Sequence, residues 1–486
     1  MKGGLPVVGS ILTIVAAGCM LAALAGCMVG PDFHSPKVDV PRQWSGAPQQ
    51  GVTSASSEVI GWWTVFGDPQ LDSLIDRAVS ANLDLKGAAA RIREARALRG
   101  VVASDLAPGV NVSGSYSRVR RSGTATPVAR DGETAEFGGG SEQDLFETGF
   151  DAGWEIDVFG RIRRRVQAAD ADLAAARWNR RDVLVVLLSE VARNYLELRG
   201  TQRRIAILKE NIDLQRKSLD LTRGRLEAGL GNKLDVAQAE ALLTTTESQV
   251  PALESSARQA MHRIGVLLGR PPEALLTELS EDKPIPPVPP EVPIGLPSEL
   301  LRRRPDIRRA EMELAAATAR IGAATADLFP SFSLTGFLGL QSADIQDLVQ
   351  SGSLLWDVGP TVSWPVFDAG RIRANIEVQN ARQEQALASY EQAVLTSLED
   401  VENALVAYAK EKQTRKSLMA AVDANRRAAD ISSALYAEGL VDFLNVLVSQ
   451  RALSQSEDEL VASDQRVSTN LVALFKALGG GWQLPR

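Results

Sequence analysis

The sequence predicts a mostly α-helical fold made of two copies of one unit, in which short strands supply part of a membrane β-barrel that several subunits complete. Three observations predict this fold class. Matching motifs recur at fixed spacings, one segment of 68 residues contains no Gly or Pro, and the strands between the helices alternate apolar and polar residues. The 486 residues, with 45% hydrophobic and 23% charged content, are ample for an ordered core.

The N-terminus predicts export and a lipid anchor. An apolar stretch from about residue 5 to 25 resembles a secretory signal closed by small residues and a cysteine. Cys27 follows Leu-Ala-Gly, the pattern at which a bacterial lipoprotein is lipidated and cut, whereas Cys19 is a poorer match. We expect a signal peptide over 1–26 and a lipidated Cys27, with an ordinary signal peptide as the alternative. Residue 28 is Met rather than Asp, which by the bacterial sorting rule directs a lipoprotein to the outer membrane.

Motifs in the first half of the chain recur in the second half. An early set is separated by 222 positions and a later set by 210, so the first copy holds about 12 extra residues. The matched pairs are Pro108 and Pro330 in the early set, and Trp154 and Trp364, Gly160 and Gly370, Val191 and Val401, and Gly229 and Gly439 in the later set. The extra length falls in 120–143, which is rich in Gly, Ser, Thr and charge and is expected to form an exposed loop.

Each copy is expected to hold a helix of roughly 35 residues, two strands and two long helices. The first repeat, 67–282, has a helix from about Pro69, strands at about 109–120 and 148–159, and helices at about 161–228 and 232–269. The second repeat, 298–479, has a helix from Pro297 to Leu328, strands at about 331–340 and 354–366, and helices at about 371–438 and 442–479. Segment 27–66 holds the anchor and an N-terminal extension, 283–297 is a Pro-rich linker, and 480–486 is a C-terminal segment.

The Gly- and Pro-free segment from Arg371 to Glu438 predicts a helix about 100 Å long. Apolar residues within it step by four and three, like a coiled-coil seam, at Val394, Leu398, Val401, Leu405 and Tyr408. A globular core cannot enclose such a helix, so we expect it to lie against parallel helices with its polar residues in water. A free two-stranded rod is the alternative, against which the strand pairs count.

The strand pattern suits either a half-buried soluble sheet, which it favours when taken alone, or a membrane barrel, which the expected export and lipid anchor favour. Residues of one parity from Phe150 to Val158 are apolar, and the residues between them are acidic or Gly. Four strands cannot close a barrel, and lipid does not tolerate open sheet edges, so we predict that three subunits contribute twelve strands. Trp154 and Trp364 are then expected in the aromatic belt at the membrane interface, with packing at a sheet corner as their alternative role.

Composition and motifs exclude several classes of function. The net charge of -7 and the lack of a basic run exclude nucleic acid as a partner. The two histidines, His34 and His262, stand beside no candidate nucleophile, and the chain has no G-x-S-x-G, no phosphate loop and no metal-ligand cluster. We therefore expect no enzymatic activity, no metal site and no cofactor.

Four spaced motifs carry a family resemblance that covers nearly the whole mature chain. They read GCMVGPDFHSP at 26–36, WWTVFGDPQLDSLIDRAVSANLDL at 62–85, WEIDVFGRIR at 154–163 and SWPVFDAGRIR at 363–373. On these residues the chain is similar to the outer membrane efflux proteins of the TolC/OprM type, and within them to the NodT-like lipoprotein branch. The resemblance implies a lipid-anchored homotrimer whose twelve-stranded barrel lies in the outer membrane, continuous with an α-helical barrel in the periplasm. It also implies a mixed equatorial domain that includes the N-terminal extension up to Trp63, the Pro-rich linker and the C-terminal segment.

The function implied by the resemblance is a passive exit duct. Such a duct belongs to a tripartite pump, here of the RND type, which exports small toxic compounds across the periplasm and the outer membrane. The implied partners are a periplasmic adaptor (membrane fusion) protein and an inner membrane transporter. Two alternatives remain open: a lipid-anchored periplasmic coiled-coil scaffold, and a type I secretion duct for polypeptides.

The resemblance also assigns residues at the two turns between long helices. Gly229, Leu230, Gly439 and Leu440 match the periplasmic tips that contact the adaptor, although Gly is also the usual residue after a helix end. These four residues are therefore candidates for adaptor contact, with a tight turn that only ends the helix as the alternative.

A gate is implied close to the same turns. Tyr436 and Asp235 match a hydrogen-bonded pair between helices or subunits, and Leu444 matches an apolar constriction ring. Family members commonly have Asp one turn beyond that leucine, where this chain has Val448, and Asn445 stands where some members have Asp. We expect a more apolar constriction, which resists passage by dewetting as well as by width.

Overall fold

The computed structural model describes residues 28–45, 52–53, 60–120, 142–289 and 291–483. The expected signal peptide, Cys27 and nearly all of the expected loop at 120–143 lie outside these residues. Two compact units make up the chain. One comprises Met1–Ser35, Arg93–Ala174 and Met312–Ala388, and the other comprises Pro36–Ile92, Ala175–Glu311 and Ser389–Arg486.

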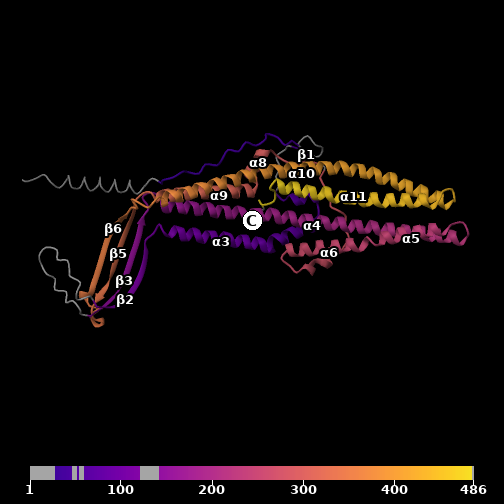
Figure 1. Cartoon of the computed structure of the whole chain (residues 1–486). Helices are drawn as coiled ribbons and strands as arrows, with labels where there is room; N and C mark the ends of the chain where they lie inside the picture. Colours follow the sequence, from indigo (N-terminus) through magenta and orange to yellow (C-terminus); the bar gives the residue numbers. More distant parts are fainter. Residues whose placement is uncertain (1–27, 46–51, 54–59, 121–141, 290, 484–486) are drawn as a thin grey trace, which may run out of the picture. The chain divides into compact units, whose positions relative to one another are not determined.

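The first unit holds a four-stranded antiparallel sheet in the order β2-β3-β5-β6 (Figure 1). Its strands are β2 (Gly109–Arg120), β3 (Glu142–Ile156), β5 (Ser331–Ser342) and β6 (Leu354–Ser363). The first repeat supplies β2 and β3 and the second supplies β5 and β6, so the central pair, with Phe150 opposite Leu338, joins the two repeats. The prediction that each chain contributes four strands to this sheet is confirmed for the described residues.

Strand β3 is shifted from its expected position near 148–159. It begins at Glu142 because charged residues that resemble a loop are paired across the ladder with β2. Arg118 donates to Glu142 at 2.7 Å, and the Tyr116 hydroxyl donates to Asp144 at 2.9 Å. Such cross-strand pairs stabilise an antiparallel ladder, so the strand extends toward the loop.

Strand β6 is shorter than expected, since it ends at Ser363 rather than near residue 366. Pro365 has no N–H with which to continue the ladder. Trp364 therefore lies just beyond the strand, where the chain bends toward the next helix.

Most of the described residues are helical. The first repeat holds α2 (Pro69–Ala81), α3 (Leu83–Ser104), α4 (Arg161–Glu227), α5 (Lys233–Glu247), α6 (Val250–Leu267) and α7 (Leu276–Leu279), and the second holds α8 (Pro297–Arg303), α9 (Pro305–Ala326), α10 (Arg371–Ala437) and α11 (Phe443–Ala477). Short 3₁₀ helices cover Trp62–Phe66, Pro272–Leu275, Ile345–Asp347 and Ser351–Ser353. The two longest helices, α4 and α10, have 67 residues each. None of the described helices combines the length and the apolar character needed to cross a membrane.

The first helix of each repeat is broken, which corrects the expectation of one continuous helix. Asn82 separates α2 from α3 because its side chain caps α3, accepting the Leu85 N–H at 3.0 Å. In the second repeat the break falls at Arg304, since Pro305 disfavours a helical conformation in the residue before it. Residues 82 and 304 are 222 positions apart, so the break belongs to the repeat itself.

The expected helix at 232–269 is also two helices, α5 and α6, which meet at Ser248 and Gln249. Pro251 explains the break, because it lacks an N–H and its ring clashes with the carbonyl one turn earlier. The equivalent residue of the second repeat is Val461, and α11 runs through it without interruption.

The core of the second unit joins segments that lie far apart in the sequence. Strand β1 (Val52–Thr53) pairs in parallel with β4 (Val292–Pro293) from the Pro-rich segment. Trp62 stacks on Phe475 of α11 with ring centroids 5.3 Å apart. In α10, the predicted seam is confirmed, because Val394, Val401 and Tyr408 are fully buried.

Candidate functional site

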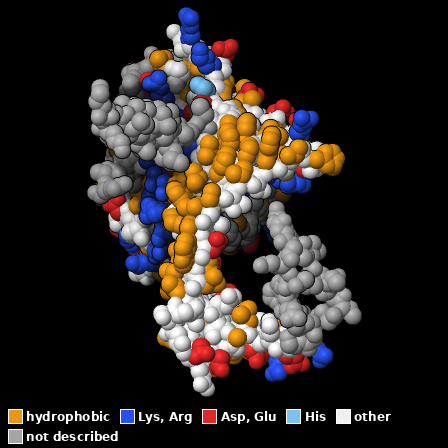
Figure 2. All heavy atoms as spheres, turned by 90° about the vertical axis from the view of Figure 1, so that its left-hand side faces the viewer, with side chains coloured by type: hydrophobic (Ala, Val, Ile, Leu, Met, Phe, Trp, Pro, Cys, Tyr) orange, Lys and Arg blue, Asp and Glu red, His pale blue; other side chains and the backbone are white. Residues whose placement is uncertain are grey.

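The sheet has one predominantly apolar face. Its register places Val112, Phe150, Leu338 and Trp356 in one row across all four strands. Between 54% and 71% of each of these side chains is exposed. Figure 2 shows hydrophobic side chains gathered in rows on the side of the molecule that carries the strands. The predicted alternation is confirmed, and an exposed apolar patch of this kind requires an apolar partner.

The opposite face of the sheet is mostly polar or small. Asn111 donates to Asp151 at 3.0 Å on this face, and Gln341 donates to Glu147 at 2.9 Å. Phe337, an aromatic residue on the same face, lies over a pair of glycines, Gly149 and Gly339. An added Cβ on either glycine would lie 2.7 Å from its ring.

A glycine forms each joint between a strand and a long helix. Gly160 and Gly370 have φ values of 79° and 87°, in the left-handed region that favours glycine. The helix N-termini are then capped by Asp157, which accepts from Ile162 N–H at 3.0 Å, and by Asp368, which accepts from Ile372 N–H at 2.8 Å. These glycines and carboxylates therefore end each strand and start each helix.

Two tryptophans tie these joints to the preceding helices. Trp154 Nε1 donates to Leu106 O at 3.0 Å, and Trp364 Nε1 donates to Leu328 O at 3.1 Å. The two contacts are equivalent in the repeats, and Trp364 remains 57% exposed. An indole whose N–H is bonded to protein and whose apolar ring is exposed suits the interface between membrane and water. This interfacial position stays a prediction.

The two turns between long helices have the same geometry. Gly229 N–H donates to Leu226 O and Leu230 N–H to Arg225 O, and Gly439 and Leu440 repeat this pattern. Both glycines have positive φ, 73° and 79°, so each turn is a glycine-capped helix end. Leu230 and Leu440 are 70% and 66% exposed, which leaves two apolar side chains on the tips.

Tyr436 and Asp235 are not paired within the chain. The Tyr436 ring is buried, with Phe443 in edge contact at 5.4 Å, and its hydroxyl has no hydrogen-bond partner among the described residues. Asp235 lies in the first turn of α5, where its N–H donates to the Asn232 side chain at 2.9 Å. A bond between them within one chain is therefore excluded here, and a bond between subunits stays a prediction.

The expected constriction residues share one exposed surface of α11. Leu444 is 56% exposed and Val448 is 59% exposed, four positions apart on one side of the helix. Asn445 is exposed beside them, and its N–H donates to Asp442 O at 3.1 Å. Phe443 on the other side packs into the tip core. Leu444 and Val448 are thus available to a facing copy.

Arg225 is a tip residue that sequence reasoning missed. Its Nη1 donates to Tyr436 O at 3.0 Å and to Ala437 O at 3.2 Å, so it caps the C-terminus of α10 from α4. Its guanidinium also lies 4.8 Å from the centroid of the Tyr436 ring. The sequence does contain a signal for this residue, because the equivalent position of the second repeat holds Leu435 instead of an arginine.

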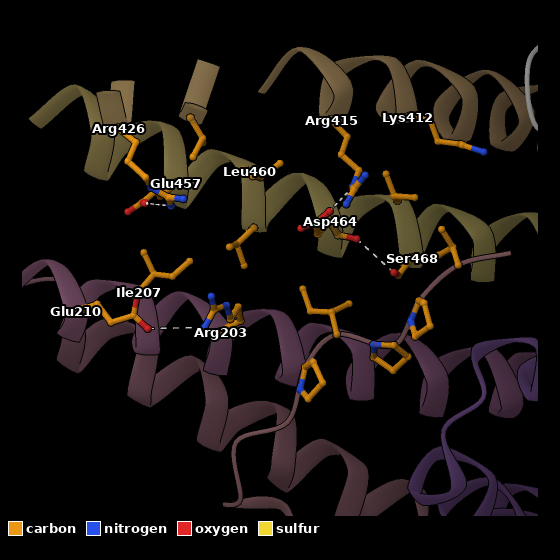
Figure 3. Close-up of a pocket in the computed structure, with 18 residues that line it drawn as sticks. Arg203, Ile207, Glu210, Lys412, Arg415, Arg426, Glu457, Leu460, Asp464 and Ser468 are labelled. Carbon is orange, nitrogen blue, oxygen red and sulfur yellow. Dashed lines mark hydrogen bonds and ion pairs between the residues drawn. The ribbon is translucent and has the colours of Figure 1, made fainter. Parts of the chain in front are cut away.

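A cavity of about 610 Å³ lies in the second unit, lined by α4, α10, α11 and the Pro-rich segment. Figure 3 shows its charged residues facing one another: Arg426 and Glu457 are 2.7 Å apart, and Arg415 pairs with Asp464. Because these charges neutralise each other, the cavity gives no indication of a charged ligand. In the described part of the chain, no group of three or more His, Cys, Asp or Glu residues is placed to hold a metal ion.

A protein-family profile matches most of the chain. The profile described as "Outer membrane efflux protein" matches residues 74–270 and 296–480, which are the greater part of both repeats.

Named proteins with similar sequences cover the chain almost completely. Nodulation protein T from Rhizobium leguminosarum bv. trifolii is 32% identical over 94% of this chain and 95% of its own. The cation efflux system protein CusC from Escherichia coli O6:H1 is 32% identical over 96% and 98%. A solved structure of the outer-membrane channel OprN is 39% identical, with a TM-score of 0.87 over 94% of this chain and 100% of that one.

Proposed function

The chain belongs to the outer membrane efflux protein family, and on that premise we propose that it is the exit duct of a tripartite pump for small toxic compounds. A periplasmic adaptor and an inner membrane transporter, of the RND type, complete the pump. CusC is named for a cation efflux system and OprN as an outer-membrane channel, and both names support this role. Family members are channel proteins rather than enzymes.

The observation that carries the proposal is the two-faced sheet. Its apolar face suits lipid and its polar face suits a water-filled lumen, which is the arrangement of a membrane barrel. Among the described residues, β2 and β6 have one neighbouring strand each, so both edges of the sheet are free. Lipid does not tolerate free edges, so further strands must come from other copies.

The internal duplication supplies a rule for closure. Strand β2 is equivalent to β5 and β3 to β6, and within the chain β3 pairs with β5. The same contact between copies pairs β6 of one copy with β2 of the next, and three copies give twelve strands. Gly149 and Gly339 are opposite each other within the chain. Gly359 is equivalent to Gly149 at a spacing of 210, and Ser117 is equivalent to Gly339 at a spacing of 222. The rule therefore places Gly359 opposite Ser117 of the next copy.

A cross-link between copies tests this closure. Directly opposite residues have Cβ atoms about 5 Å apart, within reach of a disulfide after modest adjustment. The variant carrying Gly359→Cys and Ser117→Cys should form covalent trimers in membranes, seen by non-reducing electrophoresis. Gly359→Cys with Ser113→Cys, displaced along the same strand, is the matched control. Equal cross-linking in both variants contradicts the predicted register, and a water-soluble monomer contradicts the duct.

We place the gate at the tips, where Leu444 and Val448 form an apolar ring when three copies face one another. Leu444→Ala removes three leucine side chains from the ring, so single-channel conductance in planar bilayers should rise severalfold. Leu234→Ala, at the equivalent exposed position of the first repeat, is the control, because Leu234 is 63% exposed on the other hairpin. If only Leu234→Ala raises conductance, the constriction belongs to the first hairpin. Adaptor contact is assigned to Gly229, Leu230, Gly439 and Leu440.

We place the mature chain in the outer membrane, anchored by lipid on Cys27 and extending into the periplasm. The half-buried ring of Trp154 and the exposed ring of Trp364 mark the periplasmic boundary of the barrel. Mass spectrometry of the N-terminal peptide tests the anchor, since acylation adds a defined mass. An N-terminus that is cleaved but carries no lipid contradicts the anchor. The scaffold alternative predicts that the protein has no channel conductance. The type I secretion alternative predicts that the assembled pump exports a polypeptide.

A further inference from the structure

A buried arginine at the joint of the first repeat holds the start of the described chain. Arg164, in the first turn of α4, has only 1% of its side chain exposed. Its Nε donates to Val29 O at 3.0 Å, and its Nη2 donates to Gly30 O at 3.1 Å. Nη1 lies 2.9 Å from the Asp32 carboxylate. A backbone bond from Val29 N–H to Phe159 O, at 3.2 Å, adds a further contact.

Three glycines make room for these contacts. An added Cβ on Gly160 would lie 2.7 Å from Met28 Cγ. On Gly30 it would lie 2.4 Å from Gly322 Cα, and on Gly322 it would lie 2.7 Å from Arg164 Nε. A side chain at any of these points displaces either the segment or the arginine. The joint is therefore shaped to hold this segment.

The second repeat has the same joint without these features. Ala374 stands at the position equivalent to Arg164. Gly370 and Gly100 are equivalent to Gly160 and Gly322, and an added Cβ on either would meet no atom within 4 Å. The contacts with the N-terminal segment are thus not a property of the repeat, since Arg164, Gly160 and Gly322 make contacts that their counterparts Ala374, Gly370 and Gly100 lack within the chain.

We propose that Arg164 is a positioning residue that seats Met28–Asp32 on the strand-to-helix joint and so fixes where lipid on the preceding Cys27 enters the membrane. The proposal deepens the proposed function, because it relies on lipidation of Cys27. Arginine suits this role because its planar group donates in several fixed directions at once, whereas lysine is a compact point charge. The seat itself is a property of the protein and needs no lipid to form.

Nitroxide mobility tests the seat in the full-length, membrane-extracted protein. His34 is exposed two residues beyond the seat, so His34→Cys accepts a spin label when Cys27 is acylated. Arg164→Gln removes charge-assisted bonds, and we expect the ratio of mobile to immobile label to rise about tenfold or more. Arg164→Lys should give an intermediate ratio. The melting temperature of the protein should change little, which a general structural role for Arg164 does not predict.

Matched glycine variants keep the test decisive if Arg164→Gln fails to fold. Gly322→Ala and Gly100→Ala both add one methyl group to a helix at equivalent positions. We expect Gly322→Ala to release the label because the methyl group displaces Arg164, and Gly100→Ala to leave it immobile. Equal label mobility in these two variants and in the unsubstituted chain overturns the seat. The mass of the N-terminal peptide reports on lipidation separately, so a missing lipid contradicts the anchor and a mobile segment contradicts the seat.

Discussion

The two repeats close the same helix junction with different side chains. Asn82 and Arg304 occupy equivalent positions. Asn82 donates to Leu267 O at the end of α6, at 2.9 Å, and Arg304 donates to Ala477 O at the end of α11, at 3.1 Å. Arg304 also reaches two carboxylates, those of Asp306 and Asp400, at 2.6 Å and 3.0 Å. An asparagine side chain cannot make all of these contacts, because it is too short to reach both carboxylates and carries no charge to pair with them.

The difference shows which part of a duplicated structure is constrained. Gly269 and Gly479, which follow the two capped helices, have nearly equal φ values of 65° and 68°. The backbone of the junction was therefore kept in both copies, because the helix ends need their carbonyls satisfied. The capping side chain differs between the copies, and only the second junction is ionic.

The largest expected effect comes from removing the ionic cap. Arg304→Ala leaves the largely buried Asp306 carboxylate without its partner and removes one bond to the half-exposed Asp400, so we expect a loss of about 2 to 3 kcal/mol in the free energy of unfolding. Asn82→Ala removes a cap and one further hydrogen bond and should cost about 1 to 2 kcal/mol. Thermal unfolding of the detergent-extracted protein measures both, with the exposed Arg302→Ala as control. A larger loss for Asn82→Ala contradicts the comparison.

The second prediction concerns the tip, where the first repeat has Arg225 and the second has Leu435. Arg225→Ala removes two bonds to the end of α10 and the contact with the Tyr436 ring, so we expect about 1 to 2 kcal/mol of local destabilisation. Hydrogen exchange of the 430–440 peptide should accelerate accordingly. Arg223→Ala, two residues earlier on the exposed side of α4, is the control. Unchanged exchange in Arg225→Ala means that α10 is held by other contacts.

The third prediction is that replacing the joint tryptophan destabilises the protein equally in the two repeats. Trp154→Phe and Trp364→Phe each remove one indole hydrogen bond to a helix-end carbonyl, so each should cost at most about 1 kcal/mol. Thermal unfolding with both variants side by side checks the equality. A clear difference between them shows that the two joints have different surroundings in the assembled protein.

The smallest expected effect is a pH dependence confined to the second junction. Burial raises the pKa of Asp306, but its hydrogen bond and charge pairing with Arg304 outweigh burial and leave that pKa below its ordinary value. A depressed carboxyl pKa stabilises the folded state above the unfolded value of about 3.9, and this contribution is lost as pH falls through the lower folded value. Stability should therefore fall less steeply below about pH 4 in Asp306→Asn than in the unsubstituted chain. Acid titration of unfolding, with Asp84→Asn at the equivalent position as control, checks this, and identical curves for Asp306→Asn and the unsubstituted chain contradict it.

Local patterns were enough to predict several elements of the site. The alternation from Phe150 onward predicted the apolar face, because side chains of a strand point to opposite sides with a period of two. Gly160, Gly370, Gly229 and Gly439 marked the turns, because positive φ favours glycine. Helix breaks were predicted less well. Pro251, Pro305 and the Asn82 cap on α3 are local signals for the breaks, whereas the additional bond from Asn82 to Leu267, 185 positions away, has no local signal.

The sequence by itself determined the duplication, the order of strands and long helices, and the turn residues, since each follows from periodicity or from backbone preference within a short window. The tertiary structure alone decided the partners of the key arginines. Arg164 reaches Gly30, 134 positions away, and Arg225 reaches Tyr436, 211 positions away. No local pattern encodes such contacts, because they depend on which distant backbone carbonyls folding brings within about 3 Å of a guanidinium group.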